Sequence, residues 1–193
     1  MAVISKVLVV KDNSHQIFDS IKNLVGQEVL VGIPSATASR EDDDINNAAI
    51  AYVQEFGSPE TNLPARPFLI PGVKDVQEQT IETFKKAAVA ALAQNMPKAL
   101  ELMNQAGSKA VNAARTRILN NIPPPLSPYT VANRFKMRKD KARRPNEEQY
   151  LALVAAGTAP GAAQTAANII ALVNTGKMLR AITHVVRKVN ATS

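Results

Sequence analysis

A long stretch with helical periodicity, from Asp75 to Ile118, constrains the fold more than any other part of the sequence. Apolar and small residues recur there at spacings of three and four, so they fall on one face of a helix. Pro97 interrupts the pattern, and Asn95 before it is of a type that caps helices. The stretch therefore predicts either two consecutive helices or one helix with a kink. Its second half is rich in Ala and Gly, which permits close approach of another backbone.

Short stretches rich in β-branched residues lie on both sides of this helical region. Residues 3–10 and 28–33 predict strands, and Pro34 ends the second of them. Near the other end of the chain, residues 179–189 predict a short helical turn followed by a strand. The expected fold is α+β, with a small mixed or antiparallel sheet packed on a long helix or helix pair.

Shorter helices are predicted between the strands. One begins near Ser14 and ends at Gly26, with Ile17, Ile21, Leu24 and Val25 on one face. Another begins at Asn46 or Asn47 and ends at Gly57. Residues 62–72 contain three prolines and are therefore predicted to form a rigid extended segment.

The region before the last strand differs in composition from the rest. Residues 122–128 contain four prolines, residues 134–144 are strongly basic, and residues 151–167 consist mainly of small residues. We predict an extended arm at 123–171, inserted into a core domain made of 1–122 and 172–193.

Composition limits the classes of protein that fit this chain of 193 residues. Hydrophobic residues make up 46% and aromatic residues 4%, which predicts a modest, helix-rich core within one domain. No cysteine is present, so disulfides, thiolate metal sites and a cysteine nucleophile are excluded. No signal peptide and no apolar stretch of about 20 residues occurs, so we expect a soluble, unexported protein with no membrane partner.

Charge is divided unevenly along the chain. Residues 1–95 hold 8 Lys and Arg against 12 Asp and Glu, whereas residues 96–193 hold 15 against 4, giving net charges of −4 and +11. A basic half suits nucleic acid, but halves of opposite sign also suit contact between identical copies. Charge alone leaves both interpretations open.

Residues typical of catalytic or metal sites are not grouped in this sequence. His15 and His184 have no acid or second histidine at metal-ligand spacing, and the acidic run 41–44 lacks the pattern of a calcium loop. Phosphate-binding loops and nucleophile motifs are also missing. We therefore predict a protein that is not an enzyme and has neither metal nor cofactor.

Five sequence blocks occur in an order that resembles a known family. They are VGIP (31–34), YVQEFGSP (52–59), LPARPFL (63–69), PPPLSPYTV (123–131) and LVNTGKMLRAI (172–182). This order, over residues 30–186, resembles the neck and tail-completion proteins of tailed double-stranded DNA phages. Gln54 stands where the family commonly has His, Asn174 stands where it has Asp, and the segment 135–171 is longer than usual.

The resemblance implies a structural virion protein, assembled in the host cytoplasm, that forms a homo-oligomeric ring at the head-tail junction. Such a ring joins head connector or adaptor proteins to a tail terminator or tail tube and leaves a channel for DNA. Six-fold symmetry is favoured by the resemblance, with twelve-fold symmetry as the alternative.

The expected interface residues follow from charge and from the rigid proline segment. Arg66 is predicted to pair with Glu55 or to hold a carboxylate of a neighbouring subunit. The basic arm is expected to face the acidic surface of a neighbour. Its expected interface residues are Arg138, Lys139, Arg143 and Arg144, and its candidate DNA contacts are Arg134, Lys136 and Lys141.

A second class of function fits the same charge pattern. The chain would then be a basic nucleic-acid-binding protein whose Ala-rich tail is disordered. Affinity for DNA that falls steeply with salt, measured on a monomer, would distinguish it from a ring protein.

Overall fold

The computed structural model describes residues 13–39, 45–137 and 144–189. In chain order the elements are α1 (Ser14–Val25), β1 (Gln27–Gly32), α2 (Ser35–Ala38), α3 (Asn47–Phe56), the 3-10 helix η1 (Pro59–Thr61), α4 (Leu69–Asp75), α5 (Gln77–Leu92), α6 (Met96–Leu119), α7 (Pro128–Met137), α8 (Arg144–Ala155), α9 (Pro160–Ala166), α10 (Lys177–Ala181) and β2 (Thr183–Lys188). The predicted strand at 3–10 and the acidic run 41–44 lie outside the described residues.

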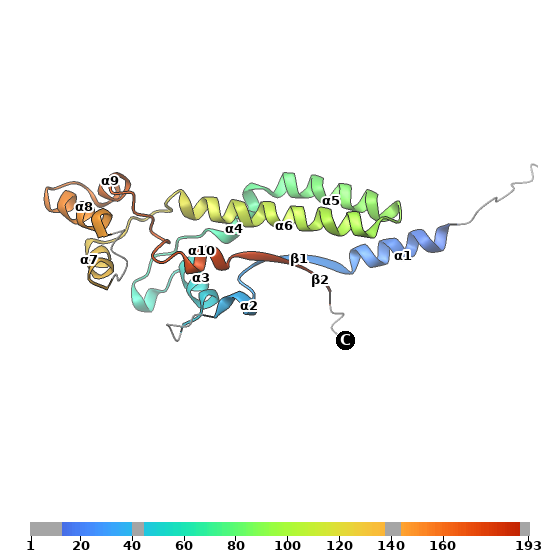
Figure 1. Cartoon of the computed structure of the whole chain (residues 1–193), viewed down its shortest axis with the longest axis horizontal. Coiled ribbons are helices and arrows are strands. Elements are labelled where there is room, and N and C mark those ends of the chain that lie inside the picture. The colour runs from blue at the N-terminus through green and yellow to red at the C-terminus, as the bar shows by residue number, and fades with distance from the viewer. Residues whose placement is uncertain (1–12, 40–44, 138–143, 190–193) are drawn as a thin grey trace, which may run out of the picture.

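The described chain is elongated (Figure 1). Helices α5 and α6 run side by side along the long axis and cover one face of the two strands. Helix α1 continues beyond the strands at one end, and α7, α8 and α9 form a separate group at the other end. The two ends of the molecule are therefore built from different parts of the sequence.

The predicted long helical region is confirmed as two helices that form a hairpin. Helix α5 ends at Leu92, and α6 begins at Met96 with Pro97 in its first turn. The side-chain oxygen of Asn95 accepts a hydrogen bond of 3.1 Å from the backbone N–H of Lys98, so Asn95 caps α6 as expected. Pro97 therefore begins a helix and does not kink one.

Within the described residues the sheet is two-stranded and antiparallel, which confirms the α+β fold. Leu30 is opposite Val185 in the register, and these two side chains are partly exposed on the outer face. Val29 and Val186 are also opposite each other, and both pack on the α5–α6 cluster around Met103. The sheet thus buries one face on the helix pair and leaves the other open.

The small residues of α6 allow other elements to approach its backbone, as the sequence predicts. A Cβ added at Gly107 would overlap the ring of His184 on β2. A Cβ added at Gly72 on α4 would lie 2.6 Å from Ala114 Cα. Strand β2 and helix α4 therefore both sit on α6 at positions where only glycine fits.

Of the segment predicted to be extended, residues 62–72, only residues 62–68 lie outside a helix, and Asn62 among them adopts a left-handed conformation. Residues 69–75 form α4, and Pro71 lies within its first turn. Proline is tolerated there because the N–H groups of a first turn have no partner inside the helix. The expectation for residues 69–72 was wrong for this reason.

The predicted extended arm at 123–171 is wrong in its described part, which forms the helical lobe α7–α9. Tyr150, which is fully buried, lies at the centre of the lobe's own hydrophobic cluster. The other buried members of this cluster are Leu126, Val131, Ala163, Ala167, Ile169 and Ala171. Small residues can pack closely around one large ring, so a stretch rich in Ala still builds a core.

A polar network joins the lobe to the end of α6. The buried side chain of Gln164 accepts a hydrogen bond from the N–H of Leu126 at 2.6 Å and donates to Asn121. Asn121 in turn accepts from the N–H of Ala171 at 2.9 Å and donates to the carbonyl of Ile169. These bonds satisfy the backbone where the chain leaves α6 and where it returns from α9.

Tyr150→Phe is expected to destabilise the protein by about 1 to 2 kcal/mol. The Tyr150 hydroxyl donates a 2.7 Å hydrogen bond to the buried carbonyl of Leu126, which would lose its partner. Burial raises the pKa of Tyr150, so its contribution to stability is complete below the pKa of free tyrosine, about 10, and is lost as the pH rises above it. Denaturant unfolding followed by circular dichroism measures both effects. The exposed Tyr129 provides the control, because Tyr129→Phe should change neither quantity.

Candidate interaction surfaces

A buried carboxylate links two of the five sequence blocks. Glu55, at the end of α3, accepts hydrogen bonds from the backbone N–H groups of Phe68, Leu69 and Ile70 at 2.7, 2.8 and 2.9 Å. These groups open α4, whose own N-cap residue, Phe68, supplies no side-chain bond. Glu55 therefore caps α4 from another element, and its charge is favoured by the positive end of the helix dipole.

The blocks YVQEFGSP and LPARPFL form one structural unit. Gly57 ends α3 with φ of 77°, and a Cβ there would lie 2.8 Å from the nitrogen of Ala65. The N–H of Arg66 donates a 2.7 Å hydrogen bond to the carbonyl of Gln54. A glycine is required at Gly57 because a side chain would be strained by the dihedral and would also collide with the returning segment.

Arg66 does not pair with Glu55, which was the first of the two contacts predicted for it. Its buried guanidinium donates to the carbonyl oxygens of Pro124 at 2.9 Å and Pro125 at 3.4 Å. Burial lowers the pKa of Arg66 below that of a free guanidinium. Glu55 is buried as well and binds the start of α4, so the predicted ion pair is wrong, and the burial of Arg66 argues against its predicted contact with a neighbouring subunit.

Arg66→Ala is expected to lower the free energy of unfolding by about 2 to 4 kcal/mol, since it leaves the carbonyls of Pro124 and Pro125 without their partner and removes buried packing. Urea unfolding of the purified variant measures the loss. Arg187→Ala is a matched control, because Arg187 is exposed and pairs with Glu28 across the sheet surface. A variant that unfolds like the wild type but fails to assemble would return Arg66 to a subunit interface.

The basic run is only partly described. Arg134 is half-buried and directs its guanidinium to the carbonyl of Ala171 at 2.7 Å, whereas Lys136 is exposed. Arg138, Lys139, Lys141, Arg143 and the side chain of Arg144 lie outside the described residues. Arg134 therefore contributes to attaching the lobe, and a DNA or protein contact of the remaining cations stays a prediction.

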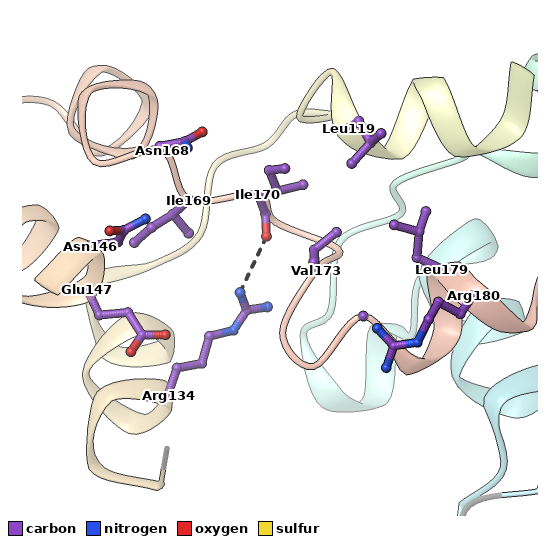
Figure 2. Close-up of a pocket in the computed structure, with 11 residues that line it drawn as sticks. Leu119, Arg134, Asn146, Glu147, Asn168, Ile169, Ile170, Val173, Leu179 and Arg180 are labelled. Atoms are coloured by element: carbon purple, nitrogen blue, oxygen red, sulfur yellow. Dashed lines mark hydrogen bonds between the residues drawn. The ribbon is translucent and has the colours of Figure 1, made fainter. Parts of the chain in front are cut away.

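A cavity of about 310 Å³ lies between the lobe and the core (Figure 2). Arg134 enters it from α7 and Arg180 from α10, with Glu147 of α8 on the lobe side. Arg180 donates to the carbonyl of Thr175 at 3.3 Å, and Arg134 donates to the backbone carbonyls of Ile170 and Ala171. Both guanidiniums thus stabilise the segment that leads from α9 to α10.

The histidines lie apart in the fold. His15 contacts Asp19 on the exposed surface of α1, so the expectation that no acid lies at metal-ligand spacing from His15 was wrong. His184 Nε2 lies 3.2 Å from the side-chain oxygen of Asn104. Within the described parts of the chain, no group of three or more His, Cys, Asp or Glu side chains could hold a metal ion. Across those same residues, no helix is both long enough and apolar enough to cross a membrane.

Helix α1 exposes most of its apolar face. Phe18 and Val25 are 70% and 73% exposed, and Ile17 and Ile21 are each exposed by more than 40%. Leu24, at the inner edge of this face, packs against the cluster formed by α5 and α6. We call Ile17, Phe18, Ile21 and Val25 the α1 stripe.

An apolar groove of about 250 Å³ lies beside the Glu55 cap. Its rim is formed by Tyr52 and Phe56 of α3, whose rings are 4.9 Å apart, and by Ile70 of α4. These three side chains are exposed although they are large and apolar. We call this site the α3–α4 groove.

No family model, no curated protein and no solved structure matches this chain. The family resemblance therefore rests on the five sequence blocks, whose residues can now be placed. Helix periodicity identified Ile17, Ile21 and Val25 as one face, but the exposure of that face and the participation of Phe18 were missed. Tyr52 and Phe56, four residues apart on α3, were the available signal for the groove.

Proposed function

We propose that this protein is a structural, non-enzymatic virion component of a tailed double-stranded DNA phage. Copies of the chain form a ring at the head-tail junction, joining the tail to the head and leaving a channel for DNA. The location and the partners, a head connector or adaptor and a tail terminator or tube, rest on the resemblance. The ring has six copies, or twelve in the alternative.

The roles of the five blocks support this proposal. Residues of three blocks pack in one hydrophobic cluster, which includes Val31, Phe68, Leu172 and Ile182. The block at 123–131 reaches the same region because Arg66 binds the carbonyls of Pro124 and Pro125, and the block at 52–59 does so because Glu55 binds the N–H of Phe68. The blocks therefore set the arrangement of the elements, as expected when a family is defined by architecture and not by a reactive site.

The observation that carries the proposal is the exposure of the α1 stripe. An amphipathic helix whose apolar face points to solvent is incomplete as a monomer, and large apolar patches of this kind mark contact sites for other chains. An assembling protein accounts for this face, whereas a monomeric nucleic-acid-binding protein does not.

The second class of function is altered by the structure. It required a disordered Ala-rich tail, but residues 144–155 and 160–166 are helices packed around Tyr150. Contact of the basic run with DNA in the ring channel stays part of the proposal, because that contact needs only exposed cations.

The mass of the purified protein tests the proposal. A chain of 20.7 kDa should give a species of about 124 kDa for six copies or about 248 kDa for twelve in native mass spectrometry, and rings with a central opening in electron micrographs. A monomer at every concentration, with DNA affinity that falls by about three orders of magnitude or more between 50 and 200 mM salt, would favour the nucleic-acid-binding function instead.

A further inference from the structure

The chain itself covers only one edge of the apolar face of α1. On a helix with about 100° per residue, Leu24 and the buried Ser20 lie at one edge of the stripe, and Phe18 and Val25 lie at the other. The covered edge faces α5 and α6, so the remaining side chains stand free along the helix. The uncovered part of α1 is therefore a convex apolar ridge.

The α3–α4 groove is the complementary surface. It is concave and apolar, and its volume of about 250 Å³ is below the roughly 300 to 1,000 Å³ of small-molecule sites. Such a groove suits one or two large side chains presented by a helix, a recurring mode of recognition between proteins. A helix ridge is thus a better occupant for it than a free ligand.

The ridge and the groove of one chain are held apart by the sheet. Strand β1 begins two residues after Val25 and ends at Gly32, which lines the groove. Six residues of strand span about 20 Å, and pairing with β2 keeps them extended. Figure 1 shows α1 beyond one end of the strands and α3 near the other end. A chain with this sheet does not fold α1 into its own groove.

We infer that the α1 stripe of one copy docks into the α3–α4 groove of the next copy. This inference rests on the proposed function, because it specifies the contact that builds the ring. The two surfaces are different parts of the chain, so the contact is head-to-tail and repeats around a closed ring.

Chemistry and size agree with this occupant. The groove is lined mainly by apolar side chains, and the carboxylate of Glu55 is buried and bound to the N–H groups that open α4, so an apolar ridge meets no unpaired charge there. One helix ridge offers less than the roughly 800 Å² per partner of a stable dimer. Every copy uses the contact twice in a ring, so closed rings should form in preference to free dimers.

Two pairs of variants test the contact. Phe18→Asp on the ridge and Tyr52→Glu in the groove should each raise the concentration needed for assembly by at least about thirtyfold. Phe18→Leu and Tyr52→Phe retain the apolar contact and should assemble like the wild type. Asn23→Asp adds the same charge on the opposite face of α1 and should have no effect. Circular dichroism establishes that each variant is folded.

Mixing the two defective variants gives a result that only a head-to-tail contact produces. The intact ridge of Tyr52→Glu fits the intact groove of Phe18→Asp, so the mixture should form a one-to-one dimer and no ring, at concentrations above those at which the wild type assembles. Defective assembly in Phe18→Asp but not in Tyr52→Glu would overturn the inference, because α1 would then contact some other surface.

A cross-link provides a readout that does not depend on stability. The chain contains no cysteine, so Phe18→Cys and Ile70→Cys can be made as separate single-cysteine proteins and mixed. Oxidation should link the two, whereas Asn23→Cys mixed with Ile70→Cys should stay unlinked. If the wild type is a monomer, the ring proposal and this contact fail together. If the wild type assembles, but Tyr52→Glu does not impair assembly and Ile70→Cys forms no cross-link, the ring proposal stands and only the docking site is wrong.

Discussion

Gly72→Ala is expected to destabilise the folded protein by about 3 kcal/mol or more, enough to leave a marginally stable chain largely unfolded. Helix α4 crosses α6 at this position, where an added Cβ would lie 2.6 Å from Ala114 Cα and 2.8 Å from Ala114 N. Both neighbours are backbone atoms of a long helix, so no side-chain rotation can relieve the overlap. Helix α4 would have to move away from α6 and carry Phe68 out of the core.

Thermal unfolding by circular dichroism measures this loss, and Gly161→Ala provides the matched control. Gly161 is also helical, but its added Cβ meets nothing closer than 3.8 Å. Alanine favours helices over glycine by up to about 1 kcal/mol, so Gly161→Ala should leave stability unchanged or raise it slightly. Equal melting temperatures for both variants would mean that α4 does not pack on α6 as described.

The elements that the sequence predicted best are those specified by neighbouring residues. Periodicity gives the two long helices, Asn95 gives the start of α6, and Asn46 caps α3 by accepting from the N–H of Ala49. Such signals lie within a few residues of the structure they determine, so no knowledge of the tertiary fold is needed.

Features that depend on distant residues could not be predicted in this way. The lobe was taken for an extended arm because Ala163 and Ala167 do not stand out as core residues until Tyr150 is placed beside them. The partner of Arg66 was also wrong, since its acceptors are carbonyls 58 and 59 residues away. Backbone acceptors carry no side-chain signal in a sequence.

The docking surfaces show a third limit on what can be predicted from the sequence. An amphipathic stripe such as that of α1 has the same pattern whether its own chain or a neighbouring copy covers it. The periodicity of Ile17, Ile21, Leu24 and Val25 predicts one apolar face, and the fold shows that the chain packs Leu24 and leaves the other three exposed. For a protein proposed to work by assembly, this difference separates the core from the interface.

Glu55→Ala is expected to cost about 3 to 5 kcal/mol of folding stability and to disrupt the α3–α4 groove. The carboxylate accepts hydrogen bonds from the three backbone N–H groups that open α4, including that of the buried Phe68. In Glu55→Ala these N–H groups would lose this acceptor. Hydrogen bonds to a charged group contribute about 1.5 to 3 kcal/mol each but are not additive, so the total is well below their sum.

Comparison of Glu55→Ala with Glu55→Gln separates capping from packing. Glutamine has the same size, but its single oxygen can serve only part of the three N–H groups, and its amide nitrogen would face the others. We therefore expect Glu55→Gln to fall between the wild type and Glu55→Ala in urea unfolding. Since Leu69 and Ile70 line the groove, both variants should also weaken assembly. If Glu55→Gln unfolds like the wild type, the cap contributes little, and the cost of Glu55→Ala comes from lost packing at the end of α3.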